Sequence, residues 1–233
     1  MTNRASDRFN ILRLKSQPAG ALISYVKCDF DEKDLAELLD DVHYLSKSNE
    51  YSLFSGTYRH KTVNFLGTGS GPASLLTALF EIIPSKIDYL IRIGACGGLN
   101  GARIHDVVNV KAALCMDSVS TILARAKRLN ASSLLIKRID KVLNHDSVQS
   151  VVGTAVSVDA MYLFERKIDR AEARGAYCWD LETATTLAFG KKFHVKTASI
   201  LVVVSDRDGK SIRSYPPIRK LSFLPSILEA LST

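Results

Sequence analysis

Arg92, Glu182 and Asp206 are the charged residues of this 233-residue chain whose positions are best suited to chemistry. Arg92 interrupts the apolar run 89–93, directly before the glycine-rich segment 94–98. A guanidinium cannot lose its proton to escape burial, so Arg92 needs an anionic partner. That partner is either a carboxylate of the chain or a bound oxyanion held in bidentate fashion, and the residues alone leave both open.

The two carboxylates stand where regular segments begin or end. Glu182, in the segment Trp-Asp-Leu-Glu-Thr-Ala-Thr, starts an expected helix, and Asp206 follows the longest apolar run of the chain. Carboxylates at such positions can serve in acid–base catalysis or bind hydroxyl groups. The alternative is structural: Glu182 caps its helix and Asp206 caps a turn.

A glycine loop, Gly-Thr-Gly-Ser-Gly-Pro at residues 67–72, lies between an expected strand and an expected helix. Glycines there would let backbone N–H groups approach an anion at the helix N-terminus. The loop matches neither the GxxxxGK[ST] phosphate loop nor the GxGxxG dinucleotide motif. It is therefore a weak signal by itself.

Apolar runs and helical patterns alternate along the chain. Strands are expected at 19–26, 51–58, 62–66, 89–93, 104–114, 151–158 and 197–206, and helices at 31–45, 73–83, 122–143, 181–193 and 221–231. The alternation predicts a single α/β domain over residues 1–233, a three-layer α/β/α sandwich with a mixed central sheet. In such sheets ligands bind at the carboxyl ends of strands, where the residues above lie.

The composition indicates a globular protein without a membrane-spanning segment. The chain is 46% hydrophobic, and no run approaches the roughly 18 apolar residues of a membrane span. Its start lacks an apolar core with a cleavage site, so a cytoplasmic location without membrane association is predicted. A net charge of +7 suits an anionic partner such as phosphate or a nucleotide, or serves solubility alone.

Cysteines and histidines do not form a metal site in the sequence. The four cysteines lie far apart without CxxC spacing, at Cys28, Cys96, Cys115 and Cys178, and are expected to be reduced core thiols. The five histidines are scattered singly, so no metal is expected. The basic stretch 124–141 is interpreted as the solvated face of a helix with Leu129 and Ile139 on its buried face, and nucleic-acid binding is not expected.

Five segments of the chain carry a family resemblance: FSGTYRHKTVNFLGTGSGPAS, YLIRIGACGGL followed by HDVVNV, VSVDAMY, WDLETAT and ILVVVSD. Together they resemble the nucleoside phosphorylase family, which includes uridine phosphorylase, hexameric purine nucleoside phosphorylase and related nucleosidases. They occur in the family's order and cover roughly residues 54–206. The resemblance implies the family's fold and a homo-oligomer, a dimer or hexamer, or else a mixed oligomer.

The resemblance also implies site residues. Arg92 corresponds to the phosphate-binding arginine, Gly69 lies in the loop that closes over phosphate, and Ala95 replaces a serine or threonine of the phosphate site. Asp206 matches the acid that protonates the base in purine-cleaving members, and Arg219 has the spacing of the arginine that assists it. The implied nucleoside-binding residues are Cys96, Gly97, Met161 in place of a stacking phenylalanine, Lys167, Leu181 in place of a methionine against the sugar, and Glu182, which would bind the ribose hydroxyls.

Several phosphate donors of the family are missing. The segment Ser-Tyr-Val-Lys-Cys-Asp-Phe replaces Gly-Asp-Pro-x-Arg, and an arginine lent by a neighbouring subunit would fall near Asn49. The resemblance favours a pentosyltransferase of purine salvage that cleaves a nucleoside with phosphate as co-substrate and no cofactor. Two alternatives stay open: an N-ribosidase that uses water, and a non-catalytic nucleoside-binding or regulatory subunit. Asp206 favours a purine base, while Lys167 leaves a pyrimidine open.

Overall fold

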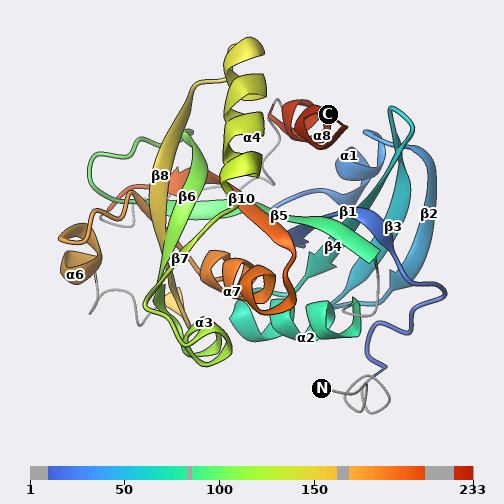
Figure 1. Cartoon of the computed structure of the whole chain (residues 1–233), viewed down its shortest axis with the longest axis horizontal. Coiled ribbons are helices and arrows are strands. Elements are labelled where there is room, and N and C mark those ends of the chain that lie inside the picture. Colours follow the sequence, from blue (N-terminus) through green and yellow to red (C-terminus); the bar gives the residue numbers. More distant parts are fainter. Residues whose placement is uncertain (1–9, 83–85, 162–167, 208–222, 233) are drawn as a thin grey trace.

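The computed structural model describes residues 10–82, 86–161, 168–207 and 223–232 as a sheet between two layers of helices (Figure 1). Helices α1, α4 and α8 cover one face, and α2, α3 and α7 cover the other. The strands are β1 (Ala19–Val26), β2 (Asp40–Lys47), β3 (Ser52–Tyr58), β4 (Lys61–Thr68), β5 (Lys86–Gly98), β6 (Val107–Met116), β7 (Arg128–Asn130), β8 (Ser150–Val158), β9 (Cys178–Asp180) and β10 (Lys196–Ser205). The helices are α1 (Glu32–Ala36), α2 (Pro72–Ile82), α3 (Ser118–Ala124), α4 (Ser133–His145), α6 (Ile168–Glu172), α7 (Thr183–Phe193) and α8 (Leu224–Ser232).

The sheet is mixed, with strand order β10-β6-β8-β9-β5-β1-β4-β3-β2. Strand β10 pairs with β5 as well as with β6, so β10, β6, β8, β9 and β5 form a closed ring of strands. Strands β4, β1, β5 and β10 run parallel, which brings their carboxyl ends to one edge of the sheet. The predicted fold class, an α/β sandwich with a mixed central sheet, is confirmed.

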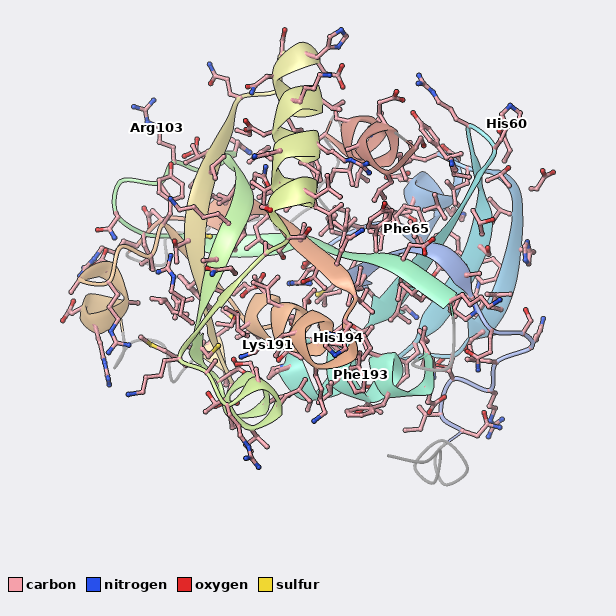
Figure 2. All side chains as sticks on the ribbon, viewed as in Figure 1. His60, Phe65, Arg103, Lys191, Phe193 and His194 are labelled. Carbon is pink, nitrogen blue, oxygen red and sulfur yellow. The ribbon has the colours of Figure 1, made fainter. Side chains whose placement is uncertain are left out.

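Side chains alternate between the two faces of the central strands, as the two-residue period of a strand requires. On β1, Ile23 belongs to the cluster covered by α4 and α8, whereas Leu22 belongs to the cluster covered by α2. Phe65 of β4 lies inside and stacks on Phe54, with ring centroids 5.3 Å apart. His60 instead lies at the exposed tip of the β3–β4 hairpin (Figure 2).

Two predicted helices are wrong in extent. The helix expected at 31–45 is only the short α1, because the chain then pairs as β2 with β3, and Tyr44 lies opposite Phe54. The residues around Val42 alternate between the faces, so the leucines that suggested a helical period belong partly to a strand. The helix expected at 122–143 is divided into α3, β7 and α4.

The division of residues 122–143 has a local cause. Arg125 ends α3 in a left-handed conformation with φ of 49°, and β7 then pairs with β6. Leu129 is buried through this strand pairing, and Ile139 is buried through α4, so both sit in the core but on different elements. Leu134, in the first turn of α4, is 38% exposed.

No helix in the described ranges has both the length and the apolar character that crossing a membrane would require. Among the same residues, no group of three or more histidine, cysteine or acidic side chains is arranged to hold a metal ion. All four cysteines are free. Cys96 and Cys178 are buried, as predicted, but Cys28 is exposed.

Candidate functional site

A cavity of about 380 Å³ opens at the carboxyl ends of β1, β5 and β10. Seven of the residues singled out from the sequence line it: Arg92, Ala95, Cys96, Gly97, Met161, Leu181 and Glu182. Asp29, Trp179 and Asp180 line it as well. Its size lies within the range of small-molecule sites, and its place at the strand ends is where α/β sheets bind ligands.

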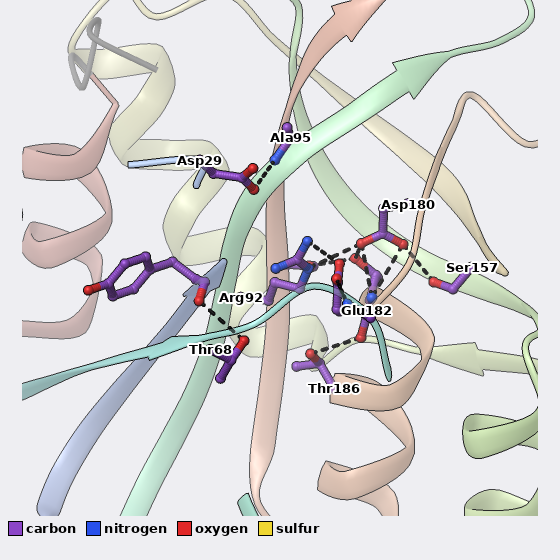
Figure 3. A network of polar contacts seen from close by, with 12 residues as sticks. Asp29, Thr68, Arg92, Ala95, Ser157, Asp180, Glu182 and Thr186 are labelled. Atoms are coloured by element: carbon purple, nitrogen blue, oxygen red, sulfur yellow. Dashed lines mark hydrogen bonds and ion pairs between the residues drawn. The ribbon is translucent and has the colours of Figure 1, made fainter. Parts of the chain in front are cut away.

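Arg92 lies in the floor of the cavity and is 2% exposed. Its Nε donates to Asp180 Oδ2 at 3.1 Å, and its Nη2 donates to Glu182 Oε2 at 2.5 Å (Figure 3). Burial lowers the pKa of Arg92, but the charges of Glu182 and Asp180 outweigh it and raise that pKa. Of the two partners left open by the sequence, the structure provides carboxylates of the chain itself.

Asp180 is held by more than Arg92. Ser157 Oγ donates to Asp180 Oδ1 at 2.6 Å, and the backbone N and Oγ1 of Thr183 donate to Asp180 Oδ2 at 3.0 and 2.6 Å. Asp180 is 3% exposed, so these bonds replace the hydration of its carboxylate. This network fixes the carboxylate that in turn orients the guanidinium.

Glu182 joins the arginine to the glycine loop. Its Oε1 accepts from the backbone N of Gly71 at 2.6 Å, while Oε2 accepts from Arg92. The residue stands at the N-cap of α7, yet its side chain makes no capping hydrogen bond. Glu182 therefore holds the N-cap position of α7 but does not cap the helix with its side chain. Burial raises its pKa to about 7, since the opposing effect of Arg92 is smaller.

Asp29 occupies a donor that an anion could otherwise use. Its Oδ2 accepts from the backbone N of Ala95 at 3.1 Å, and the side chain is 6% exposed (Figure 3). Ala95 lies on the same strand as Arg92, β5, at the position where the family resemblance places a phosphate donor. A carboxylate of the chain thus lies at the place expected for the ligand.

Next to the glycine loop, too, a carboxylate of the chain accepts from a hydrogen-bond donor that an anion could otherwise use. Ser74 Oγ, in the first turn of α2, donates to Glu50 Oε1 at 3.0 Å. A Cβ at Gly69 would lie 3.0 Å from Ser74 Oγ and 3.3 Å from Glu50 Oε1, so this glycine faces Glu50. Ser70 lines the cavity, whereas Gly69 is not among the described lining residues.

Trp179, the only tryptophan of the chain, forms a wall of the cavity. One side of it packs on a cluster that includes Leu99 and Val156. Its indole lies against Gly97, where a Cβ would come within 2.0 Å of Nε1. Gly97 is thus the residue that lets the indole approach the strand.

Comparison with known proteins places this arrangement in a family. The sequence matches the model of the phosphorylase superfamily over residues 23–215. The chain belongs to the phosphorylase superfamily. The match contains every described residue that lines the cavity.

Curated relatives of the superfamily match at low identity. A DeoD-type purine nucleoside phosphorylase from Caldanaerobacter subterraneus subsp. tengcongensis is 29% identical over 73% of this chain and 76% of its own length. One from Shewanella amazonensis is 26% identical over 85% of this chain and 86% of its own. One from Geobacillus kaustophilus is 26% identical over 64% of this chain, which spans 65% of that protein.

Among solved structures, uridine phosphorylase from Vibrio fischeri ES114 aligns with a TM-score of 0.80. The alignment covers 93% of both chains at 24% sequence identity, so this likeness concerns the fold. The superfamily fold expected from the five segments is therefore confirmed.

The remaining residues expected at the site differ in whether the structure places them at the cavity. Asp206 directly follows Ser205, which lines the cavity, but it is not itself among the described lining residues. Met161 lies at the cavity and is 66% exposed. Lys167 and Arg219 lie outside the described residues.

Three residues of the site were not singled out from the sequence. Asp180 had a weak signal, because the buried Arg92 required an anionic partner and Asp180 stands two residues before Glu182. Trp179 had the signal of being the only tryptophan, next to that pair. Asp29 had none, because the segment that carries it departs from the family pattern.

We expect Gly97→Ala to weaken ligand binding in the cavity, because the new methyl group would collide with the Trp179 indole. Overpacking of this kind costs about 1–3 kcal/mol. Tryptophan emission, which reports Trp179 alone, should shift as the indole is displaced. Gly101→Ala is the control, since a Cβ there meets nothing within 4 Å and its positive φ of 80° tests backbone strain alone. An unchanged emission spectrum in Gly97→Ala would contradict the packing described.

The raised pKa of Glu182 predicts how stability depends on pH. Its ordinary value is 4.5 and its folded value is about 7, so the folded state holds the proton more tightly. The stabilisation from this group is complete below pH 4.5 and is lost as the pH rises through 7, by about 3 kcal/mol. Denaturant unfolding of the protein and of Glu182→Gln over this window measures it. The prediction fails if the variant keeps the full pH dependence.

Proposed function

We propose that this chain cleaves the N-glycosidic bond of a nucleoside, and that water rather than phosphate attacks C1′ of the ribose. The superfamily and the cavity support the nucleoside. The observation that favours water is that the chain's own carboxylates hold the donors of the cavity floor, Arg92 and the Ala95 amide.

To bind at the floor of the cavity, phosphate would have to compete with these carboxylates for the same hydrogen-bond donors. It would have to displace Glu182 or Asp180 from Arg92, and Asp29 from the Ala95 amide. Each charged hydrogen bond contributes about 1.5–3 kcal/mol. A phosphate dianion would also lie beside three carboxyl groups and one guanidinium. Water needs none of these donors.

The other roles follow the family resemblance. Glu182 accepts from the Gly71 amide with one oxygen and from Arg92 with the other, and in this proposal its carboxylate also accepts hydrogen bonds from the ribose hydroxyls. Leu181 packs against the sugar, and Met161 contacts the base from the cavity mouth. Asp206, assisted by Arg219, donates the proton that the departing purine requires. Water gives its hydroxyl group to C1′ and its remaining proton replaces the one taken from Asp206.

The test is release of base from inosine, adenosine, guanosine and uridine, with and without phosphate, while the sugar product is identified. We expect free ribose at a rate independent of phosphate, and a large loss of rate in Asp206→Asn. The exposed Asp88→Asn, the same change far from the cavity on β5, is the matched control.

Two results would overturn the proposal. Strict phosphate dependence with ribose 1-phosphate as the product would establish phosphorolysis, which the sequence favours. Binding of nucleosides without turnover under either condition would indicate a non-catalytic nucleoside-binding subunit. Cytoplasmic location and assembly into a homo-oligomer or mixed oligomer stay predictions from the sequence.

A further inference from the structure

A second hollow, of about 620 Å³, lies between α4, α8 and the tip of the β3–β4 hairpin (Figure 1). We call it the hairpin groove, bounded by Arg59 of the hairpin, Arg138 and Lys141 of α4, and Glu229 of α8. Among the described lining residues, none is shared with the cavity of the candidate site. The two lie at opposite edges of the sheet, because the hairpin tip precedes β4 whereas the glycine loop follows it.

Helix α4 turns a basic face to the hairpin groove. Four residues with the i, i+3, i+4, i+7 spacing of one helix face line the groove: Arg138, Lys141, Val142 and His145. The other side of the helix is buried in the core through its leucines and Ile139. The basic face is therefore held in position by the packing of the helix.

The two carboxylates of the groove already have partners. Glu229 forms an ion pair with Arg59. Asp146, which follows α4, accepts from Ser226 Oγ and lies 3.0 Å from His145 Nδ1. Neither carboxylate is thus paired with the lysine or the arginine that α4 presents.

Arg138 and Lys141 take part in no ion pair within the ranges that the structure describes. Arg138 also lines an adjoining hollow of about 420 Å³, which reaches His60 and Lys61 at the hairpin tip (Figure 2). Asp88 is the one acidic residue among the described residues that line this second hollow. Basic groups of α4 and of the hairpin therefore lie along one stretch of surface rather than at one point.

We propose that the hairpin groove binds a polyphosphate chain, either free or as the tail of a nucleoside di- or triphosphate. A chain of two or three phosphates presents several charges to the cations of α4 and of the hairpin at once, whereas a single phosphate presents at most two. Guanidinium and ammonium groups are usual partners of phosphate oxygens. The net charge of +7 also suits such an anion.

The groove can also take the organic part of a nucleotide. Its volume lies within the range of small-molecule sites. Tyr58, Val142 and Pro225 give it apolar surface against which a nucleoside can pack. The proposal goes beyond the nucleoside cleavage proposed above and does not depend on it.

Titration calorimetry on the full chain, with a chelator to remove divalent cations, tests the ligand class. The probes are tripolyphosphate, ATP and inorganic phosphate. We expect tripolyphosphate and ATP to bind at least ten-fold more tightly than inorganic phosphate, with an affinity that falls as salt is added. A higher affinity for ATP than for tripolyphosphate assigns the nucleoside to the ligand, and equal affinities assign the polyphosphate chain alone.

Variants locate the binding. Arg138→Met and Lys141→Met each remove one cation but keep a long side chain, and each should weaken tripolyphosphate binding about ten-fold, as loss of one charge-assisted hydrogen bond does. Arg103→Met and Lys192→Met are the matched controls, because both residues are exposed and neither is among the described lining residues of the groove. Figure 2 shows Arg103 on the other side of the molecule from His60. Both controls should bind tripolyphosphate as the unchanged protein does.

Three results would overturn the proposal. The first is that neither tripolyphosphate nor ATP binds at low salt. The second is that Arg138→Met and Lys141→Met both keep full affinity, and Lys141 is exposed, so loss of folding does not confuse this variant. The third is an equal loss in Arg103→Met, because the anion would then respond to net charge alone. None of these results bears on base release, which both groove variants should retain at the full rate.

Discussion

Glu182→Gln is expected to lower the rate of base release about 100- to 1,000-fold, the loss that follows removal of one preorganised electrostatic contact in an active site. The amide keeps the size of the side chain and can still accept from the Gly71 amide. It cannot accept from Arg92 and from two ribose hydroxyls as a carboxylate does. The loss should therefore appear in kcat/KM for every nucleoside that is cleaved.

Two further variants decide whether the lower rate of base release in Glu182→Gln arises at the candidate site. Glu37→Gln makes the same change at the exposed end of α1 and should leave the rate unchanged. Glu182→Asp keeps the charge but shortens the reach, and should recover part of the rate. If Glu182→Gln retains full activity while it remains folded, Glu182 does not contact the substrate. The role carried over from the family would then be wrong.

Much of the fold was predictable because apolar runs with two-residue alternation or continuous burial mark central strands. The expected strand 19–26 coincides with β1, and the strands expected at 51–58 and 62–66 correspond to β3 and β4, which pair as a hairpin. The left-handed φ of Arg59 and His60 is the geometry that a two-residue hairpin turn requires. The helix expected at 31–45 was wrong because residues 40–47 pair with the next strand, β3, at the edge of the sheet, and this pairing overrides the helical spacing of the leucines.

The candidate site was predictable in its location but not in its charge. Arg92 and Glu182 meet at one cavity near the strand ends, as expected, although the short β9 that precedes Glu182 runs antiparallel to β5. The partner of Arg92 could not be assigned, because it depends on how α7 follows β9 in space. Asp29 reaches the Ala95 amide from a different strand end, 66 residues away in the sequence. Long-range contacts of single side chains leave no periodic signal.

Asp180→Ala is expected to lower the free energy of unfolding by about 3–5 kcal/mol, because it leaves a buried charge with one partner fewer. Arg92 would lose its Nε acceptor, while Ser157 and Thr183 would lose the carboxylate to which they donate. For a domain of this length, this corresponds to a fall in Tm of about 10 °C. Denaturant unfolding and calorimetry measure the change.

The control is an exposed ion pair of the same kind. Asp169 is paired with Arg207 at 3.0 Å, but its side chain is 88% exposed. Asp169→Ala should therefore change stability by less than about 1 kcal/mol. A double-mutant cycle with Arg92→Met completes the test: removing the guanidinium should cost less when Asp180 is already absent, since the buried charge then disappears with its partner. Equal costs in both backgrounds would show that the two residues do not stabilise each other, and that the network around Asp180 depends on its neutral donors alone.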